Sequence, residues 1–452
     1  MKNNFQKRLI ISASLSLIFT FSMMAQTDLG THFMNNSLSQ SNLSNPALFS
    51  DFSVIVSLPS VYADLSNPNF TLDDVLSETE NGSSIQIDNL LSKLGSDGLS
   101  FQANGAVETF GLNIQHDKYL FNFHHAVRVF NQTSLSKDLV QFVWGGHDQF
   151  VGDPVNIDIQ QNLLAYQELG LAFGYRVNDN FSFGTRIKWL KGLATLQTPS
   201  ATASINGDIG QFQLSTSSNF KIQTGGLPIS DLEDLGQLSF SDIDMNWLVQ
   251  NNGISFDFGI NYQHDDWGIE ASFNNIGGIT WKENAYNFES QGVYQFDGFD
   301  LEKIVDGSEI STVEIIDSIS NLFQLEERET TLKTATPTTA HVSFRYDIAN
   351  RLYVSPFFFL QNFNGNSSTA VGLNIKKDFA DIFTIGTQYA YQGNHNIGLM
   401  SSLRLGPLQV YAVTDNIISI FDNRKTQKFN IRTGVNLVFG NKYEKPLKCR
   451  KF

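Results

Sequence analysis

The sequence contains little cysteine and little positive charge, and after its first segment it has no long apolar run. Its only cysteine is Cys449, so no internal disulfide can stabilise the fold. Lys and Arg total 30 against 45 Asp and Glu, and the formal net charge of −15 argues against nucleic-acid binding. No stretch of about 18 apolar residues follows residue 25, which argues against a transmembrane helix. A soluble secreted β-protein and a membrane β-barrel remain.

Sequence patterns for catalysis and metal binding are also missing. There is no His-Glu-x-x-His pattern, no spaced set of cysteines and no Gly-x-Ser-x-Gly turn. His124 and His125 are neighbours, so on a strand their side chains point to opposite faces and cannot bind one metal together. We therefore expect no enzyme activity, no cofactor and no metal site.

Residues 1–25 have the features of a secretory signal peptide. Lys2, Lys7 and Arg8 supply a positively charged start, and residues 9–21 supply a short apolar core. Small-residue cleavage after Ala25 would leave a mature chain without a cysteine at its start, so a lipoprotein is not expected. The sequence predicts export to the cell envelope.

Phenylalanine and two-residue alternation are abundant. The chain has 38 Phe, yet hydrophobic residues make up only 41%, which is typical of a barrel because half of every strand is polar. Residues 254–263 and 267–273 alternate apolar and polar side chains around a polar turn at 264–266. One face of this hairpin is aromatic and the other carries Asp257 and Glu270. Comparable alternation recurs at 119–129, 169–177, 181–189, 342–346, 371–375, 383–391, 399–403, 410–414 and 429–439.

These arms predict an all-β protein with one closed antiparallel transmembrane β-barrel over residues 51–440. The arms number about 14, with an uncertainty of two, and span about 9–11 residues or more. Closure pairs every backbone amide, as lipid requires. We expect short helical insertions and long external loops: helices at 72–76, 88–94, 137–143, 231–235 and 315–323, an extended hairpin at 200–224, and a large external loop over most of 282–331.

The polar faces of the arms carry eight charged residues that are candidates for lining the lumen. They could line a pore or hold an anionic headgroup. Alternatively they form a salt-bridged network that fills the barrel, because a charge on the lipid face costs about 2–4 kcal/mol at the midplane. We favour the network. The candidates are Arg128, Arg176, Arg186, Lys188, Asp257, Glu270, Arg345 and Arg432.

Large aromatic residues near the ends of the arms fit the girdles that flank a membrane barrel. This interpretation needs no sugar-binding role for the tryptophans. The residues are Trp189, Trp267, Trp281, Tyr262, Tyr391 and Phe439.

The order of several short motifs resembles an uncharacterised family of Gram-negative outer-membrane β-barrels, classed as a domain of unknown function of the 5723 type. That family is related to long-chain fatty-acid transporter and secretion-system barrels. The likeness covers nearly all of the mature chain. The motifs lie at residues 44–47, 186–192, 251–257, 275–278 with Trp281, and 414–416.

In the fatty-acid transporters, an Asn-Pro-Ala segment closes an N-terminal plug that enters the lumen. The resemblance therefore implies that residues 26–50 are a leader able to form a plug, with Asn45, Pro46 and Ala47 as its end. The alternative is an ordinary turn leading into the first strand, which Pro46 suits because it fixes φ and extends the preceding residue. We favour the turn.

The resemblance to these families suggests two functions, and the composition of the chain is also compatible with a third. The first is an integral outer-membrane barrel that acts as a channel or transporter for small or hydrophobic molecules. The second is a non-transporting barrel that anchors or assists a secretion or surface-assembly complex, for which the basic tail at 441–452 could dock a partner. The third is a soluble secreted β-protein. Both barrel hypotheses predict the cell outer membrane as the location and its lipid as a partner.

Overall fold

The computed structural model describes residues 29–34, 37–79, 82–96, 98–145, 154–208, 213–227, 251–296, 326–380 and 382–441. The predicted signal peptide, the basic tail beyond residue 441 and the helices expected at 231–235 and 315–323 lie outside these residues.

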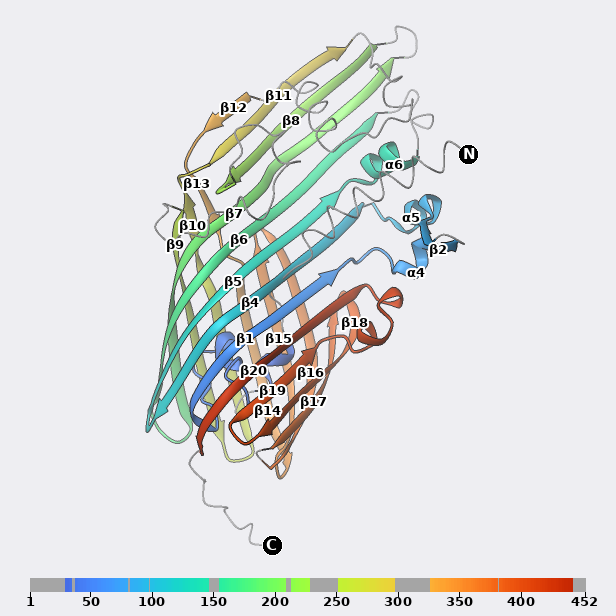
Figure 1. Cartoon of the computed structure of the whole chain (residues 1–452). Coiled ribbons are helices and arrows are strands. Elements are labelled where there is room, and N and C mark those ends of the chain that lie inside the picture. The colour runs from blue at the N-terminus through green and yellow to red at the C-terminus, as the bar shows by residue number, and fades with distance from the viewer. Residues whose placement is uncertain are drawn as a thin grey trace.

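The described chain forms a closed barrel of 14 antiparallel strands, which confirms the predicted fold class and strand number (Figure 1). The barrel closes where β1 pairs with β20, from Phe52 opposite Asn441 to Ser66 opposite Lys428. In order around the barrel, the strands are β1 (Phe52–Ser66), β4 (Leu99–His116), β5 (Tyr119–Leu135), β6 (Val155–Arg176), β7 (Phe181–Asp208), β9 (Asn252–His264), β10 (Trp267–Trp281), β14 (Thr338–Ala349), β15 (Leu352–Phe363), β16 (Asn366–Phe379), β17 (Phe383–Gln392), β18 (Asn394–Leu405), β19 (Leu408–Thr414) and β20 (Lys428–Asn441).

The two ends of the barrel differ. At one end, which we call the turn end, the strands join through short turns such as 117–118, 265–266 and 350–351, and β1 starts and β20 finishes there. The opposite end, the loop end, carries the long connections. Figure 1 shows the turn end at the bottom of the view.

The wall is much taller on one side of the loop end. There β7 runs on past the barrel and pairs with β8 (Gln213–Gly225), as the predicted hairpin at 200–224 requires. β8 pairs with β11 (Tyr286–Phe296) and β11 with β12 (Glu326–Glu329), while β13 (Leu332–Ala335) pairs with β10. Both β11 and β12 belong to residues 282–331, most of which the sequence predicts to be an external loop. These two segments are strands, and residues 297–325 lie outside the described residues.

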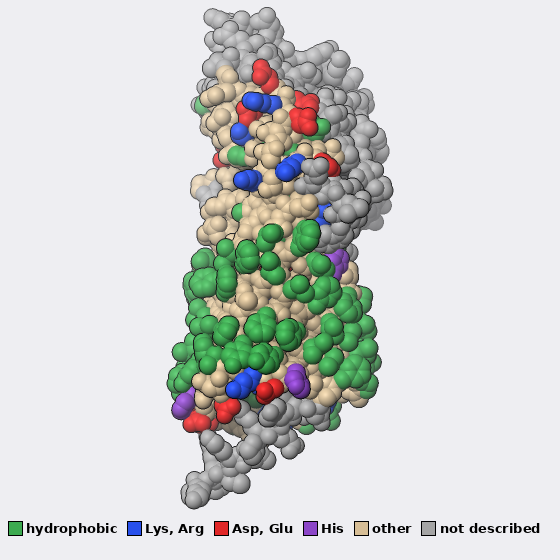
Figure 2. Space-filling model, turned by 90° about the vertical axis from the view of Figure 1, so that its left-hand side faces the viewer, with side chains coloured by type: hydrophobic (Ala, Val, Ile, Leu, Met, Phe, Trp, Pro, Cys, Tyr) green, Lys and Arg blue, Asp and Glu red, His purple; other side chains and the backbone are tan. Residues whose placement is uncertain are grey.

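The outside of the barrel is an apolar belt. Each of its 14 strands exposes at least one large hydrophobic side chain, for example Phe121, Leu171, Trp189, Phe258 and Tyr389. Figure 2 shows the belt around the lower part of one side, with charged and histidine side chains below it and charged ones above it. The aromatic rows are therefore not buried between stacked sheets, so the prediction of a soluble β-protein does not fit.

Small helices cover part of the loop end, close to where the sequence predicts them. They are α4 (Leu72–Val75), α5 (Ile87–Lys93) and α6 (Lys137–Gly145), beside the hairpin of β2 (Leu76–Thr79) and β3 (Gly82–Ile85). Val75, Leu90, Leu94 and Val140 form their shared core. Two further short helices, α9 (Ile418–Phe421) and η4 (Asn423–Lys425), precede β20. Among the described helices, none combines the length and apolarity needed to cross a membrane.

A bulge in β10 corrects one prediction about the aromatic girdle. The register of β9 and β10 shifts between Phe273 and Ile276, and Asn275 has φ +60°. The extra residue reverses which side chains face inward. Trp281, predicted to lie at the lipid interface, is therefore buried inside with 0% exposure.

Candidate functional site

The N-terminal residues lie inside the lumen rather than joining the sheet. Residues 29–34 and 37–50, which we call the lumen segment, contain the two short helices α2 (Leu29–His32) and α3 (Ser41–Ser44). In Figure 1 they are the blue ribbons within the lower half of the barrel. Met34, Leu38, Asn45 and Ala47 all have 0% exposure.

A row of three glycines makes room for the Asn45-Pro46 part of this segment. Gly174 pairs with Gly184, which pairs with Gly259, so the three lie side by side on β6, β7 and β9. A Cβ on Gly184 would lie 2.2 Å from the Pro46 carbonyl oxygen, and one on Gly259 would lie 2.0 Å from Asn45 Oδ1. No larger residue fits at these two positions while the segment stays in place.

Hydrogen bonds fix the same part of the segment to the wall. The Asn45 amide donates to the Ile260 carbonyl at 3.2 Å, and the Ser182 hydroxyl donates to the Ala47 carbonyl at 3.0 Å. Asn45, Pro46 and Ala47 thus lead into β1 and also lie against the inner wall.

Arg186 is the strongest polar link between the wall and the segment. Its Nη2 donates to the carbonyl oxygen and Oδ1 of Asn42 at 2.8 and 2.7 Å, and its Nη1 donates to the Leu43 carbonyl at 3.0 Å. Nη1 also contacts Asp257 Oδ2 at 3.0 Å. One fully buried guanidinium therefore joins α3 to β7 and β9.

The helix α2 is held from the other side of the lumen. His32 Nε2 lies 3.0 Å from Glu270 Oε2, and the centre of the His32 ring lies 3.6 Å from the centre of the His341 ring. The backbone amide of Gly30 donates to Asp415 Oδ1 at 3.0 Å. Apolar side chains complete the contact: Leu29, Phe33, Met34 and Leu38 pack on Phe357, Phe359, Ala370, Ala390, Met400, Tyr411 and Val413.

Opposite that apolar wall lies a buried charged network. Asp257 accepts from Arg186, from Lys188 at 2.9 Å and from the backbone amide of Asn275 at 2.8 Å, while Lys188 Nζ also donates to Asn275 Oδ1 at 2.5 Å. All of these side chains are at most 3% exposed. One carboxylate thus serves two cations.

The network continues across β4, β5, β6 and β20. Glu168 Oε1 accepts from Arg128 at 2.7 Å and lies 2.9 Å from His124 Nε2. Glu108 accepts from Arg432 and from the Ser60 hydroxyl. Removing one partner of such a buried ion pair destabilises the fold strongly, because the other partner is left as a buried charge without a counter-charge.

The structure brings together most of the residues that the sequence nominated. Arg128, Arg186, Lys188, Asp257 and Arg432 belong to the charged network described above, while Glu270 and Arg345 line a pocket on the other wall. Arg176 is half-buried near the turn end, where its guanidinium lies 4.3 Å from the centre of the Phe49 ring.

Four network members were not nominated: Glu108, His124, Glu168 and Asn275. Glu168 directly precedes the predicted arm at 169–177 and falls on the polar side of its two-residue alternation, so the sequence contained a usable signal for it. Asn275 enters the interior only through the β10 bulge, for which Asn275 and the following Gly277-Gly278 were the one sequence sign.

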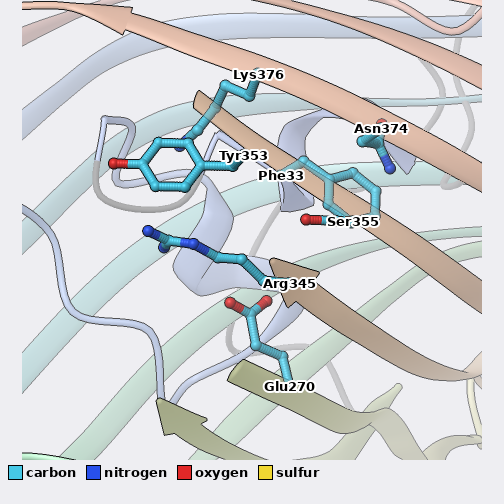
Figure 3. A pocket seen from close by; sticks show the side chains of 7 residues that line it. All are labelled: Phe33, Glu270, Arg345, Tyr353, Ser355, Asn374 and Lys376. Carbon is cyan, nitrogen blue, oxygen red and sulfur yellow. The ribbon is translucent and has the colours of Figure 1, made fainter. Parts of the chain in front are cut away.

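A small pocket remains beside the lumen segment (Figure 3). Its free space is about that of one water molecule. Arg345 stacks on the Tyr353 ring at 3.8 Å and bonds to Asp347 at 2.9 Å. The pocket is lined by Phe33, Glu270, Arg345, Tyr353, Ser355, Asn374 and Lys376.

Several solved structures resemble this chain distantly. A Pseudomonas aeruginosa homologue of FadL has 12% identity and a TM-score of 0.43, with 93% of this chain and 96% of that chain covered. The Ralstonia pickettii toluene transporter TbuX has 11% identity and a TM-score of 0.40, with 92% of this chain and 96% of that chain covered. A deletion mutant of the monoaromatic hydrocarbon channel TodX has 8% identity and a TM-score of 0.43, with 88% of this chain and 94% of that chain covered.

No curated protein matches the chain. A family model does match, over residues 46–415, which include all of the barrel strands from β1 to β19. The chain belongs to the Family of unknown function (DUF5723).

Proposed function

We propose that this chain is an outer-membrane channel for small molecules, apolar ones included, whose lumen is obstructed by its own lumen segment. The observation that carries the proposal is the position of that segment. It fills the lumen beside the charged network, yet it pairs with no strand of the barrel.

The membrane location follows from the outer surface. An apolar belt bounded by charged side chains is the surface that lipid solvates, and the closed sheet leaves no backbone edge in hydrocarbon. Short turns face the periplasm in such barrels, so the turn end would be periplasmic and the loop end external. Export would need the signal peptide proposed at residues 1–25.

The segment is suited to be a movable obstruction. β1 pairs with β20 and β4 along its length, so the barrel stays closed without any backbone contribution from the segment. What holds the segment is a set of side-chain hydrogen bonds and apolar contacts. These can be lost without opening the sheet.

The wall behind the segment supports the inclusion of apolar cargo. Phe357, Phe359, Met400 and Tyr411 face the interior on β15, β18 and β19, opposite the charged network. Moving the segment would expose an apolar stripe beside a charged one. A passage of this kind can accept a molecule with an apolar body and a polar end.

Conductance of the purified full-length protein in planar lipid bilayers tests the proposal. Gly184→Ala forces a Cβ against Pro46 and should displace the segment, so we expect frequent openings where the native protein is mostly closed. Gly386→Ala is the matched control, because its Cβ would lie 2.9 Å from the flexible end of Met400 and 3.2 Å from the Ile375 carbonyl oxygen, and it would contact no atom of the segment.

The heat-dependent gel shift of a folded barrel confirms that each variant is folded. A folded Gly184→Ala protein that stays as silent as the control would refute the channel and favour a barrel that anchors a partner complex.

A further inference from the structure

The loop end of the lumen is bridged by the turn between β15 and β16. Asn364 at the turn donates to Asn162 Oδ1 on β6 at 2.9 Å, and Asn366 donates to Gln132 Oε1 on β5 at 3.4 Å. Four strands, β7, β9, β10 and β14, separate β6 from β15 around the wall. These contacts therefore run across the lumen, from the low wall to the tall one.

Phe363 at the base of this turn enters an apolar site on the opposite side. Its ring centre lies 5.9 Å from that of Phe130, and its side chain is only 6% exposed. The site, which we call the aromatic seat, is formed by Phe130, Leu164, Tyr166, Leu190, Ile279, Trp281, Ala285 and Leu332.

The position of Trp281 in the aromatic seat is fixed by contacts that do not involve the turn between β15 and β16. Trp281 Nε1 donates to Thr334 Oγ1 at 2.9 Å, which fixes the indole. A Cβ on Gly192 would lie 2.6 Å from the indole ring, and one on Gly225 would lie 3.0 Å from it, so both glycines make room for Trp281. The seat therefore stays in place when Phe363 leaves.

Polar contacts hold the turn only weakly. The Asn364–Asn162 bond is exposed to solvent, and the Asn366–Gln132 bond is long. The connection itself is only Asn364 and Gly365, which have φ values of 49° and 84°. Burial of the Phe363 ring is therefore the main attachment of the turn, and any molecule that buries a similar ring can replace it.

We propose that the aromatic seat is a binding site for a small apolar molecule, which enters the lumen by displacing Phe363 and so releases the turn. The buried Tyr166 hydroxyl, which has no hydrogen-bond partner, gives the site one polar group for an acceptor on the molecule. This inference rests on the proposed function in treating the lumen as a path and the loop end as external. Its test measures access to the lumen rather than conductance.

The test uses Ser255→Cys as a reporter in the Cys449→Ser background. Ser255 has 0% exposure and is opposite Lys188 in the β7–β9 pairing, so its side chain lies inside the barrel. A sulfonated maleimide that cannot cross the membrane is added to intact cells, where it reaches only the loop end. Toluene, the analogue of the Phe side chain, serves as the probe molecule.

We expect toluene to raise the labelling rate at least tenfold. Phe363→Ser should raise it without toluene and abolish any further response. Phe288→Ser, which removes an equally buried ring (2% exposed) from β11, should label at the native rate and still respond to toluene.

Two results would overturn the proposal. Equal acceleration by toluene in native and Phe363→Ser proteins would place its action in the bilayer, and native-rate labelling of Phe363→Ser would show that the turn does not control access. Either result would leave the Gly184→Ala conductance, and with it the channel, unaffected.

Discussion

Arg186→Lys should release the lumen segment while leaving the barrel intact. The lysine keeps the positive charge beside Asp257, so the ion pair on the wall survives. It cannot reproduce the planar fork that reaches both Asn42 and Leu43, because an ammonium group is a point charge on a flexible stem. The change is thus directed at the bonds to the segment.

The structure sets the size of the effect. The three bonds from the guanidinium to the segment are 2.7, 2.8 and 3.0 Å long, and each hydrogen bond from a charged donor contributes about 1.5–3 kcal/mol. If lysine retains one of the three, the loss is about 3 kcal/mol or more, which corresponds to a factor of about 10² in the equilibrium between docked and released segment.

A thiol in the segment reports its release. Ser39→Cys is nearly isosteric at a site with 5% exposure, and with Cys449→Ser it is the only cysteine. In detergent, where both ends are accessible, the maleimide labelling rate follows the released population when docking is fast. We expect Arg186→Lys to label about 10²-fold faster than the native background.

Arg345→Lys is the matched control. Its guanidinium bonds to Asp347 on its own strand at 2.9 and 3.4 Å. If Arg186→Lys labels no faster than Arg345→Lys, while both show the gel shift of a folded barrel, the claim that Arg186 holds the segment is wrong.

Three further predictions follow from other parts of the structure. Phe258→Arg puts a charge in the apolar belt at a site with 49% exposure and should destabilise the barrel in lipid by about 2–4 kcal/mol in urea titrations, whereas Phe421→Arg, 84% exposed on α9, should not. Asn275→Ala should cost about 1–2 kcal/mol for its φ of +60° besides the lost side-chain bonds to Lys188 and to the Pro337 carbonyl, and Asn275→Gly should lose only the bonds. The hydrogen bond from Lys93 lowers the pKa of the Asp74 carboxyl from its ordinary value of 3.8 to about 2. The ionised carboxylate therefore stabilises α4 and α5 fully above pH 3.8, and this stabilisation is lost as the pH falls through about 2. Pepsin should cleave within residues 72–94 faster as the pH falls from 3.8 to 2. The Lys93→Met protein should already be cleaved faster than the native protein at pH 4.

The sequence was sufficient for the barrel because alternation is a local property. Phe256, Phe258 and Ile260 face outward whatever their neighbours around the barrel are, so periodicity alone places them. The same two-residue alternation places the side chains of Arg186, Lys188 and Asp257 on the inner face of the barrel. It could not show that Arg186 and Lys188 share one carboxylate, because that depends on the register between β7 and β9.

Irregular and long-range features escaped sequence reasoning. After the bulge at Asn275, the inward and outward positions along β10 are exchanged, so the Trp281 side chain faces inward. A single inserted residue leaves no periodic signal in the sequence. The glycine row at Gly174, Gly184 and Gly259 looked like ordinary small residues on three separate arms. Its meaning appears only when the strands lie together with Pro46 against them.

The shared carboxylate of Asp257 leads to a prediction about the open channel. With the lumen segment docked, the second positive charge beside Asp257 is partly compensated by the carbonyl oxygens of Asn42 and Leu43 that Arg186 contacts. When the segment leaves, Arg186 and Lys188 face the lumen with one carboxylate between them. This part of the passage then carries a local surplus of one positive charge, and positive side chains that line a pore favour anions.

Reversal potentials of the Gly184→Ala channel in a potassium chloride gradient measure this surplus. We expect an anion preference that Lys188→Met abolishes, because Arg186 and Asp257 then balance. Lys221→Met removes an equal charge from β8 at a site 39% exposed outside the barrel and should leave the preference unchanged. A preference that persists in Lys188→Met, or that Lys221→Met removes equally, would mean that selectivity is set elsewhere along the lumen, and the compensation of Arg186 by the segment would then have no bearing on conduction.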